Sequence, residues 1–416
     1  MAIETDAAGP PRSTLPDARA LRAPLALAIA CFVVWGLAYG LLDVLNKHFQ
    51  ETLHVGKAQS TWLQTAYFGA YLVMSVPAGF LLQARGYRFG IVFGLCITAA
   101  GALLFIPSAS AASFPAFVGA MFVLASGLCC LETAADTYVN GLGPPEHAPR
   151  RLNLAQSFNA LGVALGPLIG GALFFRGSGG QFEVQATYLV IAIAVLVFAA
   201  VVSRARLPEI HDAHHEPDTA MCDAAAGVGG GLLQRPHFVL GVATQALYVG
   251  AQVGVGAFFI NLVTETWPGL TSRDGAFLLS LATGAYLVGR FATTALLLRL
   301  SPRTVLTLYG LVNLALCLVV ALGLPRISAM ALVAVFFFMS TMFATIFTLG
   351  VSGLGAQTKR GASMMVMAIG GGVLLPYPMG RIAEAHGTPA AFLLPAICFG
   401  VVALYGWRGA KIAARP

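Results

Sequence analysis

The chain alternates between long apolar blocks and short polar segments along almost its whole length. The apolar blocks run for about 20 residues with few charged side chains, which is the length that an α-helix needs to cross the hydrocarbon core of a bilayer. The pattern therefore predicts twelve membrane-spanning helices. We place them at residues 24–46, 58–82, 88–107, 114–140, 152–175, 184–204, 236–263, 274–298, 303–323, 327–350, 361–382 and 389–408.

A long hydrophilic segment interrupts this pattern between the sixth and the seventh helix. The predicted parts are an N-terminal tail (1–23), a six-helix bundle (24–204), a connector (205–235), a second six-helix bundle (236–408) and a C-terminal tail (409–416). The halves resemble each other, because a basic pair leads into the fifth helix of each, in RRLNLAQ and in KRGASMM. We therefore predict an all-α membrane protein with two pseudo-symmetric halves, which is the plan of the major facilitator fold.

The basic residues are distributed unevenly between the two sides of the predicted membrane. With both termini on one side, seventeen of the 24 Lys and Arg residues fall on that side, six fall on the other, and Arg290 lies within a helix. Cytoplasmic loops carry an excess of basic residues, so we expect both termini in the cytoplasm and the protein in the cell (inner) membrane. This asymmetry accounts for the net charge of +7, and we expect no nucleic-acid partner.

The composition supports the membrane class. The chain is 58% hydrophobic and 10% charged, whereas a soluble chain carries about 25% charged residues. The seven cysteines have neither disulfide nor zinc spacing, and the N-terminal segment lacks the pattern of a cleaved signal peptide. We expect no cofactor and no metal site, although three histidines, His211, His214 and His215, lie together in the connector.

Three carboxyl groups lie within the predicted helices. A charge at the bilayer centre costs about 2.5–3.5 kcal/mol on insertion scales, so such a group is normally protonated, paired or turned toward water. Glu132 lies deep in the fourth helix, and Asp136 shares its face one turn further on. Two carboxylates so close resist double ionisation, which favours a proton on one of them. We predict that Glu132, Asp136 and Asp43 of the first helix serve proton coupling.

Two of these carboxyl groups also admit a structural interpretation. Asp43 lies toward the outer part of its helix and could pair with Lys47 one turn further on. Asp136 could instead cap the inner end of its helix.

Amide and aromatic side chains share helix faces with these carboxyls. Gln156 and Asn159 are three residues apart on the fifth helix, and Gln245 and Gln252 are seven apart on the seventh. Amides donate and accept hydrogen bonds, as sugar hydroxyls require, although they also serve contacts between membrane helices. The apolar face of a sugar stacks on aromatic rings. The predicted substrate-binding residues are Gln156, Asn159, Trp35, Tyr39, Gln245, Gln252 and Tyr248, accompanied by Phe158 and Tyr286.

The segment CLETAADTYV, followed by RLNLAQSFNALG, resembles the signature of the fucose–proton symporter family within the major facilitators. In the second half, YVGAQVGVGAFFIN, GRFATTALLLRLSPRTVLTLY and TKRGASMMVMAIGGGVLLPYPMG continue the resemblance. It implies that Asp43 and Glu132 are the two membrane carboxyls of the family, implicated in proton coupling and gating. It also implies that Gln156 and Asn159 line the sugar cavity, and Gln252 matches a polar position of the seventh helix.

The chain departs from that family at four positions. Leu42 replaces an Asn, Asp136 replaces an Asn, Ala344 replaces a Pro, and Gln83 stands where the general facilitator signature has an acidic residue. The first three change the polarity of the cavity, so they bear on which sugar is bound and leave the fold unaffected.

We interpret the chain as a transporter and not an enzyme, because the sequence offers no nucleophile–base pair, phosphate loop or metal set. The leading hypothesis is import of a monosaccharide, fucose- or hexose-like, by proton symport through alternating access. The expected partners are the sugar, protons and the lipid bilayer, and the protein is expected to act as a monomer. A sodium-coupled sugar transporter, a proton-antiporting exporter of a drug-like molecule and a sugar sensor remain alternatives.

Overall fold

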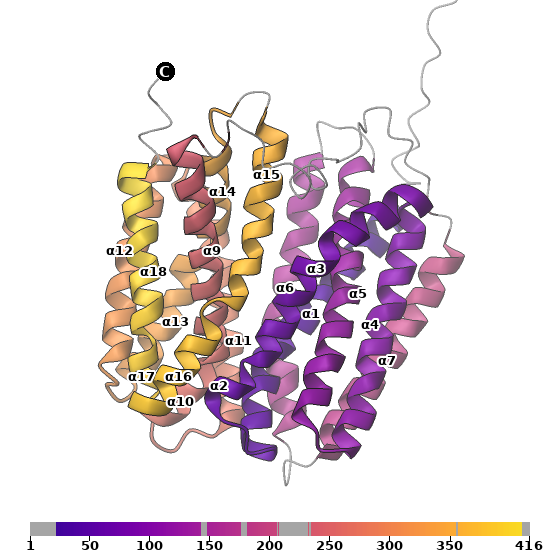
Figure 1. Cartoon of the computed structure of the whole chain (residues 1–416), viewed down its shortest axis with the longest axis horizontal. Coiled ribbons are helices and arrows are strands. Elements are labelled where there is room, and N and C mark those ends of the chain that lie inside the picture. The colour runs from indigo at the N-terminus through magenta and orange to yellow at the C-terminus, as the bar shows by residue number, and fades with distance from the viewer. Residues whose placement is uncertain are drawn as a thin grey trace, which may run out of the picture.

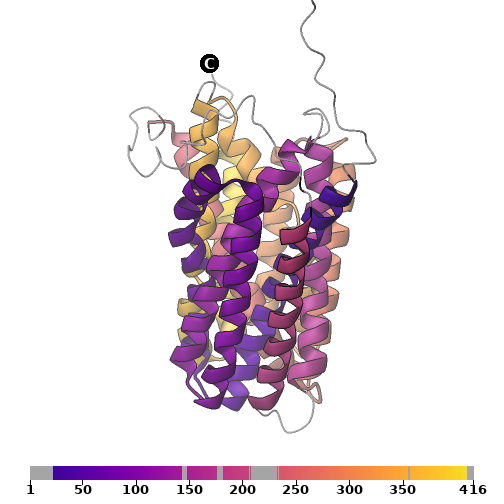
Figure 2. The same cartoon turned by 90° about the vertical axis from the view of Figure 1, so that its right-hand side faces the viewer.

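The computed structural model describes residues 22–142, 148–175, 181–205, 207, 232, 234–354 and 357–409. The predicted tails and the predicted connector lie almost entirely outside the described residues. All regular elements of the described part are helices, and they form two bundles side by side (Figure 1). Figure 2 shows that the long helices run nearly parallel to one direction, as expected for membrane-spanning helices.

The first bundle contains α1 (Arg22–Thr52), α2 (Lys57–Ser60), α3 (Trp62–Arg85), α4 (Tyr87–Ser110), α5 (Phe114–Gly141), α6 (Ala148–Phe174) and α7 (Gln181–Arg204). The second contains α9 (Pro236–Ala257), α10 (Phe259–Thr266), α11 (Ser272–Leu296), α12 (Pro302–Ala321), α13 (Ile327–Met339), α14 (Met342–Val351), α15 (Thr358–Met367), η3 (Ala368–Val373), α16 (Pro376–His386), α17 (Thr388–Ala391), α18 (Leu393–Leu404) and η4 (Tyr405–Gly409).

Twelve segments of the described chain are long and apolar enough to span a membrane, which confirms the predicted helix count. The first span is longer than predicted, because α1 continues to Thr52 rather than ending near residue 46. Its last turns contain polar residues that the hydropathy pattern assigns to the membrane surface. Asn46 and His48 are nevertheless buried, since these turns pack against other helices.

Four spans of the second half are interrupted where the sequence predicts continuous helices. The breaks lie at Phe258, at Ser340–Thr341, in the 3₁₀ segment η3 and at Phe392. The run AIGGGV of η3 has no bulky side chains at the contact, so neighbouring helices approach it closely. A Cβ on Gly371 would collide with the backbone of Ala246, and one on Gly372 would press on the ring of Phe68 in the first half.

Small residues also bring α1 and α6 together within the first half. A Cβ on Gly36 would meet the backbone of Asn159, and one on Gly166 would meet the backbone of Gly40. Backbones this close allow dense van der Waals packing, which replaces the hydrophobic driving force that lipid does not supply.

The two halves are bonded to each other mainly at one end of the molecule. We call this the closed end, and it contains α2, α10 and α17, at the bottom of Figure 1. The end where α1 begins and η4 ends is called the opposite end. The hydrogen bonds that the structure describes between the halves run from Lys57–Glu265 at the closed end to Ser280–Ala164 near the middle. Toward the opposite end the two bundles diverge (Figure 1).

We expect Gly166→Ala to destabilise the protein by about 1–3 kcal/mol, because the added methyl group would collide with backbone atoms of α1. Thermal unfolding of the detergent-solubilised protein would measure this as a lowered Tm. The matched control is Gly119→Ala on α5, where a Cβ meets no atom within 4 Å. Equal effects of the two substitutions would contradict the packing argument.

Candidate functional site

One face of α1 carries most of the polar groups between the two halves. Tyr39, Asp43, Asn46 and Gln50 follow one another at intervals of three or four residues, so they share a side of the helix. This side of α1 is in contact with α3 of the same half and with α9 and α10 of the other half. Groups on it can therefore respond when the halves move relative to each other.

Asp43 lies where three helices meet. Gln64 of α3, which is fully buried, donates its amide to the Asp43 carboxyl group (Nε2–Oδ1 3.3 Å). On the other side the carboxyl group lies against Gly256 of α9, where even a Cβ would collide with it. Lys47 is paired with Glu51 instead (3.3 Å). The described residues therefore do not contain the Asp43–Lys47 pair of the structural alternative.

Glu132 has polar contact on one side only. The Tyr71 hydroxyl lies near the carboxyl group, whereas the buried Oε2 atom has no hydrogen-bond partner among the described residues. A bare carboxylate oxygen without a donor is costly in an apolar interior, and a proton on this group removes that cost. The arrangement is therefore suited to a carboxyl that accepts and releases a proton.

Tyrosine side chains connect this carboxyl group to α1. Tyr71 stacks on Tyr67 at a centroid distance of 5.3 Å, and their hydroxyl groups lie 3.5 Å apart. The Trp35 indole lies near the Tyr67 hydroxyl, and the Tyr39 ring lies 5.8 Å from the Tyr67 ring. The predicted aromatic residues of α1 and the predicted proton-coupling residue Glu132 thus belong to one chain of contacts.

Asp136 interacts with the predicted amide of α6. Gln156 donates to its carboxyl group (Nε2–Oδ1 3.5 Å). Because α5 continues to Gly141, Asp136 does not lie at the helix end as the capping interpretation requires. Arg151 instead binds the carbonyl groups of Val139 and Asn140 at that end.

The predicted substrate-binding amides have different surroundings. Asn159 donates to the Phe32 carbonyl group of α1 (3.2 Å), which joins α6 to α1. Gln245 is fully buried, and neither of its amide atoms has a hydrogen-bond partner among the described residues. Gln252 lies two turns further along α9 and is partly buried. An unpaired buried amide costs about 1–3 kcal/mol, so Gln245 is a group for which a bound polar molecule would be favourable.

Three tyrosines from the two halves lie near one another. Tyr248 of α9 is fully buried and donates its hydroxyl to the Met339 carbonyl group (2.8 Å). Tyr286 of α11 contacts the Tyr248 hydroxyl and lies close enough to Tyr39 of α1 for an electrostatic interaction. Predicted residues from both halves therefore face one central region.

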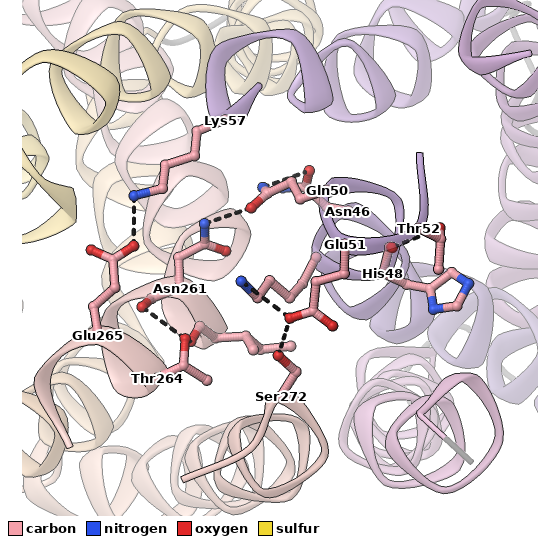
Figure 3. A network of polar contacts seen from close by, with 12 residues as sticks. Asn46, His48, Gln50, Glu51, Thr52, Lys57, Asn261, Thr264, Glu265 and Ser272 are labelled. Carbon is pink, nitrogen blue, oxygen red and sulfur yellow. Dashed lines mark hydrogen bonds and ion pairs between the residues drawn. The ribbon is translucent and has the colours of Figure 1, made fainter. Parts of the chain in front are cut away.

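The sequence analysis missed the polar network of the closed end (Figure 3). Asn46 donates to the Ala257 carbonyl group (3.2 Å), and Asn261 of α10 donates to Gln50 (2.6 Å). The signal was present, since Asn46 and Gln50 continue the polar face of α1 that begins with Tyr39. Hydropathy alone ended the predicted span at Asn46 and left Gln50 outside it.

Lys57 forms the outermost contact of this network. Its amino group binds Glu265 of α10 (2.5 Å) and the Thr388 hydroxyl of α17 (2.9 Å). The Ala58 amide beside it donates to Glu384 of α16 (2.9 Å). The short helix α2 is thereby attached to three helices of the other half.

Twelve spanning helices in two halves, with polar and ionisable groups at their contact, define the class of secondary transporters. Residues 27–373 match the model of the Major Facilitator Superfamily, and the chain belongs to this family.

Individual relatives cover nearly the whole chain. It is 36% identical over 387 residues to the glucose/galactose transporter of Brucella abortus, covering 91% of this chain and 92% of the relative. It is 34% identical over 409 residues to the L-fucose-proton symporter of Escherichia coli, covering 92% of each.

Solved structures agree with this assignment. The fucose:proton symporter FucP of E. coli has a TM-score of 0.67 at 32% identity and is matched over 95% of this chain and 100% of that one. FucP in its outward conformation gives 0.68 at 32% identity, over 96% and 100% of the chains. A D-xylose-proton symporter at 12% identity, matched over 92% and 96%, shows the shared fold with a TM-score of 0.76.

We expect Gln50→Leu to open the closed end more than Lys57→Met. Leucine leaves the fully buried Asn261 amide unpaired, at a cost of about 1–3 kcal/mol. The Lys57 and Glu265 side chains are 26% and 36% exposed, and exposed pairs contribute about 0–1 kcal/mol. Spin labels would be placed at Phe182 and Leu322, which are exposed at the closed end, one in each half. Their separation would measure the fraction of molecules in which this end is open.

The labels require a background without the seven native cysteines. A larger open population for Lys57→Met than for Gln50→Leu would show that the exposed ion pair, and not the buried amide, holds the closed end together.

Proposed function

We propose that the protein imports a monosaccharide by proton symport, with both termini in the cytoplasm. The observation that carries this proposal is the position of Asp43, a membrane-depth carboxyl group between Gln64 of one half and Gly256 of the other. A proton on this group changes the energy of bringing the halves together. The names of the similar proteins, which include an L-fucose-proton symporter and a glucose/galactose transporter, support the substrate class.

The proposed orientation gives the described state a place in the transport cycle. With the termini in the cytoplasm, the closed end faces outward and the diverging helices face inward. The structure then corresponds to an inward-facing state. FucP in its outward conformation would represent the opposite state of a similar protein.

Protonation of Asp43 would favour closure of the outer end. In this state Gly256 displaces water from one side of the carboxyl group, and Gln64 supplies a hydrogen bond on the other. An ionised group loses much of its hydration there, whereas a protonated group loses little. Closure of the outer end would therefore follow the binding of a proton from outside, and the proton would then be released on the inner side.

The sugar would bind between the halves on groups from both. In the first half these are Trp35, Tyr39, Gln156 and Asn159, and in the second half Gln245, Tyr248 and Gln252. Stacking of the ring on Tyr39 would act on Glu132 through the contacts of Tyr67 and Tyr71. Sugar and proton binding would become coupled, because each ligand shifts the equilibrium only through unequal affinity for the two states.

We expect Glu132→Gln to abolish accumulation of sugar while leaving exchange of sugar across the membrane intact. Glutamine resembles the protonated acid in shape and cannot release a proton. Proteoliposomes with an inward proton gradient would be tested with labelled fucose, galactose, glucose, mannose and N-acetylglucosamine, with and without an uncoupler. The unmodified protein should concentrate at least one sugar, and the uncoupler should prevent this.

The matched control is Glu183→Gln, which neutralises a carboxyl group in the first turn of α7. It should retain accumulation. Full gradient-driven accumulation by Glu132→Gln would contradict the assignment of Glu132. Accumulation that depends on sodium and ignores protons would favour the sodium-coupled alternative, and sugar binding without flux would favour a sensor.

A further inference from the structure

Arg290 is a cation at membrane depth for which the described state provides no ionic partner. It lies 18 residues after the start of α11, and its side chain is partly buried. No hydrogen bond or ion pair connects its guanidinium group to a residue in the described part of the chain. Its charge acts on the hydroxyl of Tyr248 in the same half. Intramembrane charges are normally paired, so a partner is expected in another state of the protein.

The contacts between α6 and α11 indicate where that partner lies. The two helices run antiparallel across the junction of the halves, and they are in contact at Gly171–Ala276 and at the Ser280–Ala164 hydrogen bond. Arg290 follows Ser280 by ten residues, and Leu154 precedes Ala164 by ten. Continued packing of the two helices would therefore place Arg290 opposite Leu154, about 15 Å beyond the last described bond.

Gln156 lies within one helical turn of that point and is bonded to Asp136. The depths agree as well, because Asp136 is five residues from the end of α5 and Arg290 is six residues from the end of α11. Both helix ends lie at the opposite end of the molecule. A guanidinium group reaches across a helical turn and forms a strong, forked pair with a carboxylate.

We propose that closure of the opposite end brings Arg290 of the second half into an ion pair with Asp136 of the first half, with Gln156 beside it. This pair holds the opposite end shut, as the contacts of Gln50 and Lys57 hold the closed end shut in the described state. The proposal rests on the alternating access contained in the proposed function. The proposed pair is particular to this chain, because Asp136 stands where the fucose–proton symporter family, which the chain resembles, has an uncharged Asn.

With this pair, each of the two states would satisfy polar groups that the other state leaves unpaired. Among the residues with described positions, Arg290 has no anionic partner, and Asp136 has only the amide of Gln156 at 3.5 Å. In the other state the two charges would neutralise each other, while the buried amides of the closed end would separate. Each closure is thereby favoured by polar groups that the other leaves unpaired.

Distance measurements between spin labels at Val201 and Leu298 test the proposal without sugar or a proton gradient. Both side chains are exposed near the opposite end, in different halves. The substitution Gln50→Leu in the cysteine-free background serves to populate the second state. We expect Arg290→Gln and Asp136→Asn each to lower the ratio of short to long distances roughly 5- to 150-fold, the range of typical coupling energies.

Two double variants separate a direct pair from independent effects. Arg290→Gln with Asp136→Asn should lower the ratio no further than either substitution alone, since both remove the same interaction. Arg290→Asp with Asp136→Arg should restore part of the short-distance population. Arg273→Gln, which removes a cation from the other end of the same helix, should leave the ratio unchanged.

Unchanged distances in both single variants, additive losses in the neutral double variant, or an equal loss with Arg273→Gln would each overturn the proposal. The labels report on helix positions and not on sugar. A failure of sugar uptake in the unmodified protein would therefore contradict the proposed function and leave this result standing.

Discussion

An ionisable side chain inside an apolar helix bundle must be paired, protonated or hydrated, and four such groups among the described residues meet that requirement in different ways. Asp43 has an amide on one side and a glycine of the opposite half on the other. Glu132 has one tyrosine hydroxyl, Asp136 has one glutamine amide, and Arg290 has no ionic partner among the described residues. None of these environments is complete in the described state. A change of protonation or of conformation can therefore alter the energy of each group.

The polar contacts between the halves are also of a kind that can be broken and formed again. A large apolar interface would hold the halves in one position, whereas amide and ion-pair contacts can be exchanged for water at modest net cost. At the closed end Gln50 and Asn261 are joined by a single hydrogen bond, and Lys57 is partly exposed. At glycine contacts such as Gly256 at Asp43 and Gly372 at Phe68, a side chain of one half packs directly against the backbone of the other, without interlocking side chains. Reversible closure requires this combination.

Hydropathy predicted the helix count, because the bilayer sets both the length and the polarity of a spanning helix. It failed where tertiary contacts override polarity. Gln50 looks like a surface residue in the sequence, yet α1 continues past it, and Asn261 of the distant half donates a hydrogen bond to it. The break at η3 also depends on partners, namely Ala246 and Phe68, that no local pattern reveals. The spacing of Asp136 from Glu132, and of Gln156 from Asn159, predicted which residues share a helix face, but only the packing of α5 on α6 shows that Asp136 and Gln156 meet.

In proton symport, sugar and protons cross the membrane together, so a measurement of their joint movement tests the proposed function most directly. Proteoliposomes containing a pH-sensitive dye would be supplied with a transported sugar in the absence of any imposed proton gradient. Proton symport predicts acidification of the interior that begins on addition of the sugar, and this signal should disappear in the Glu132→Gln variant. Entry of labelled sugar with no accompanying change of internal pH would show that sugar crosses without protons.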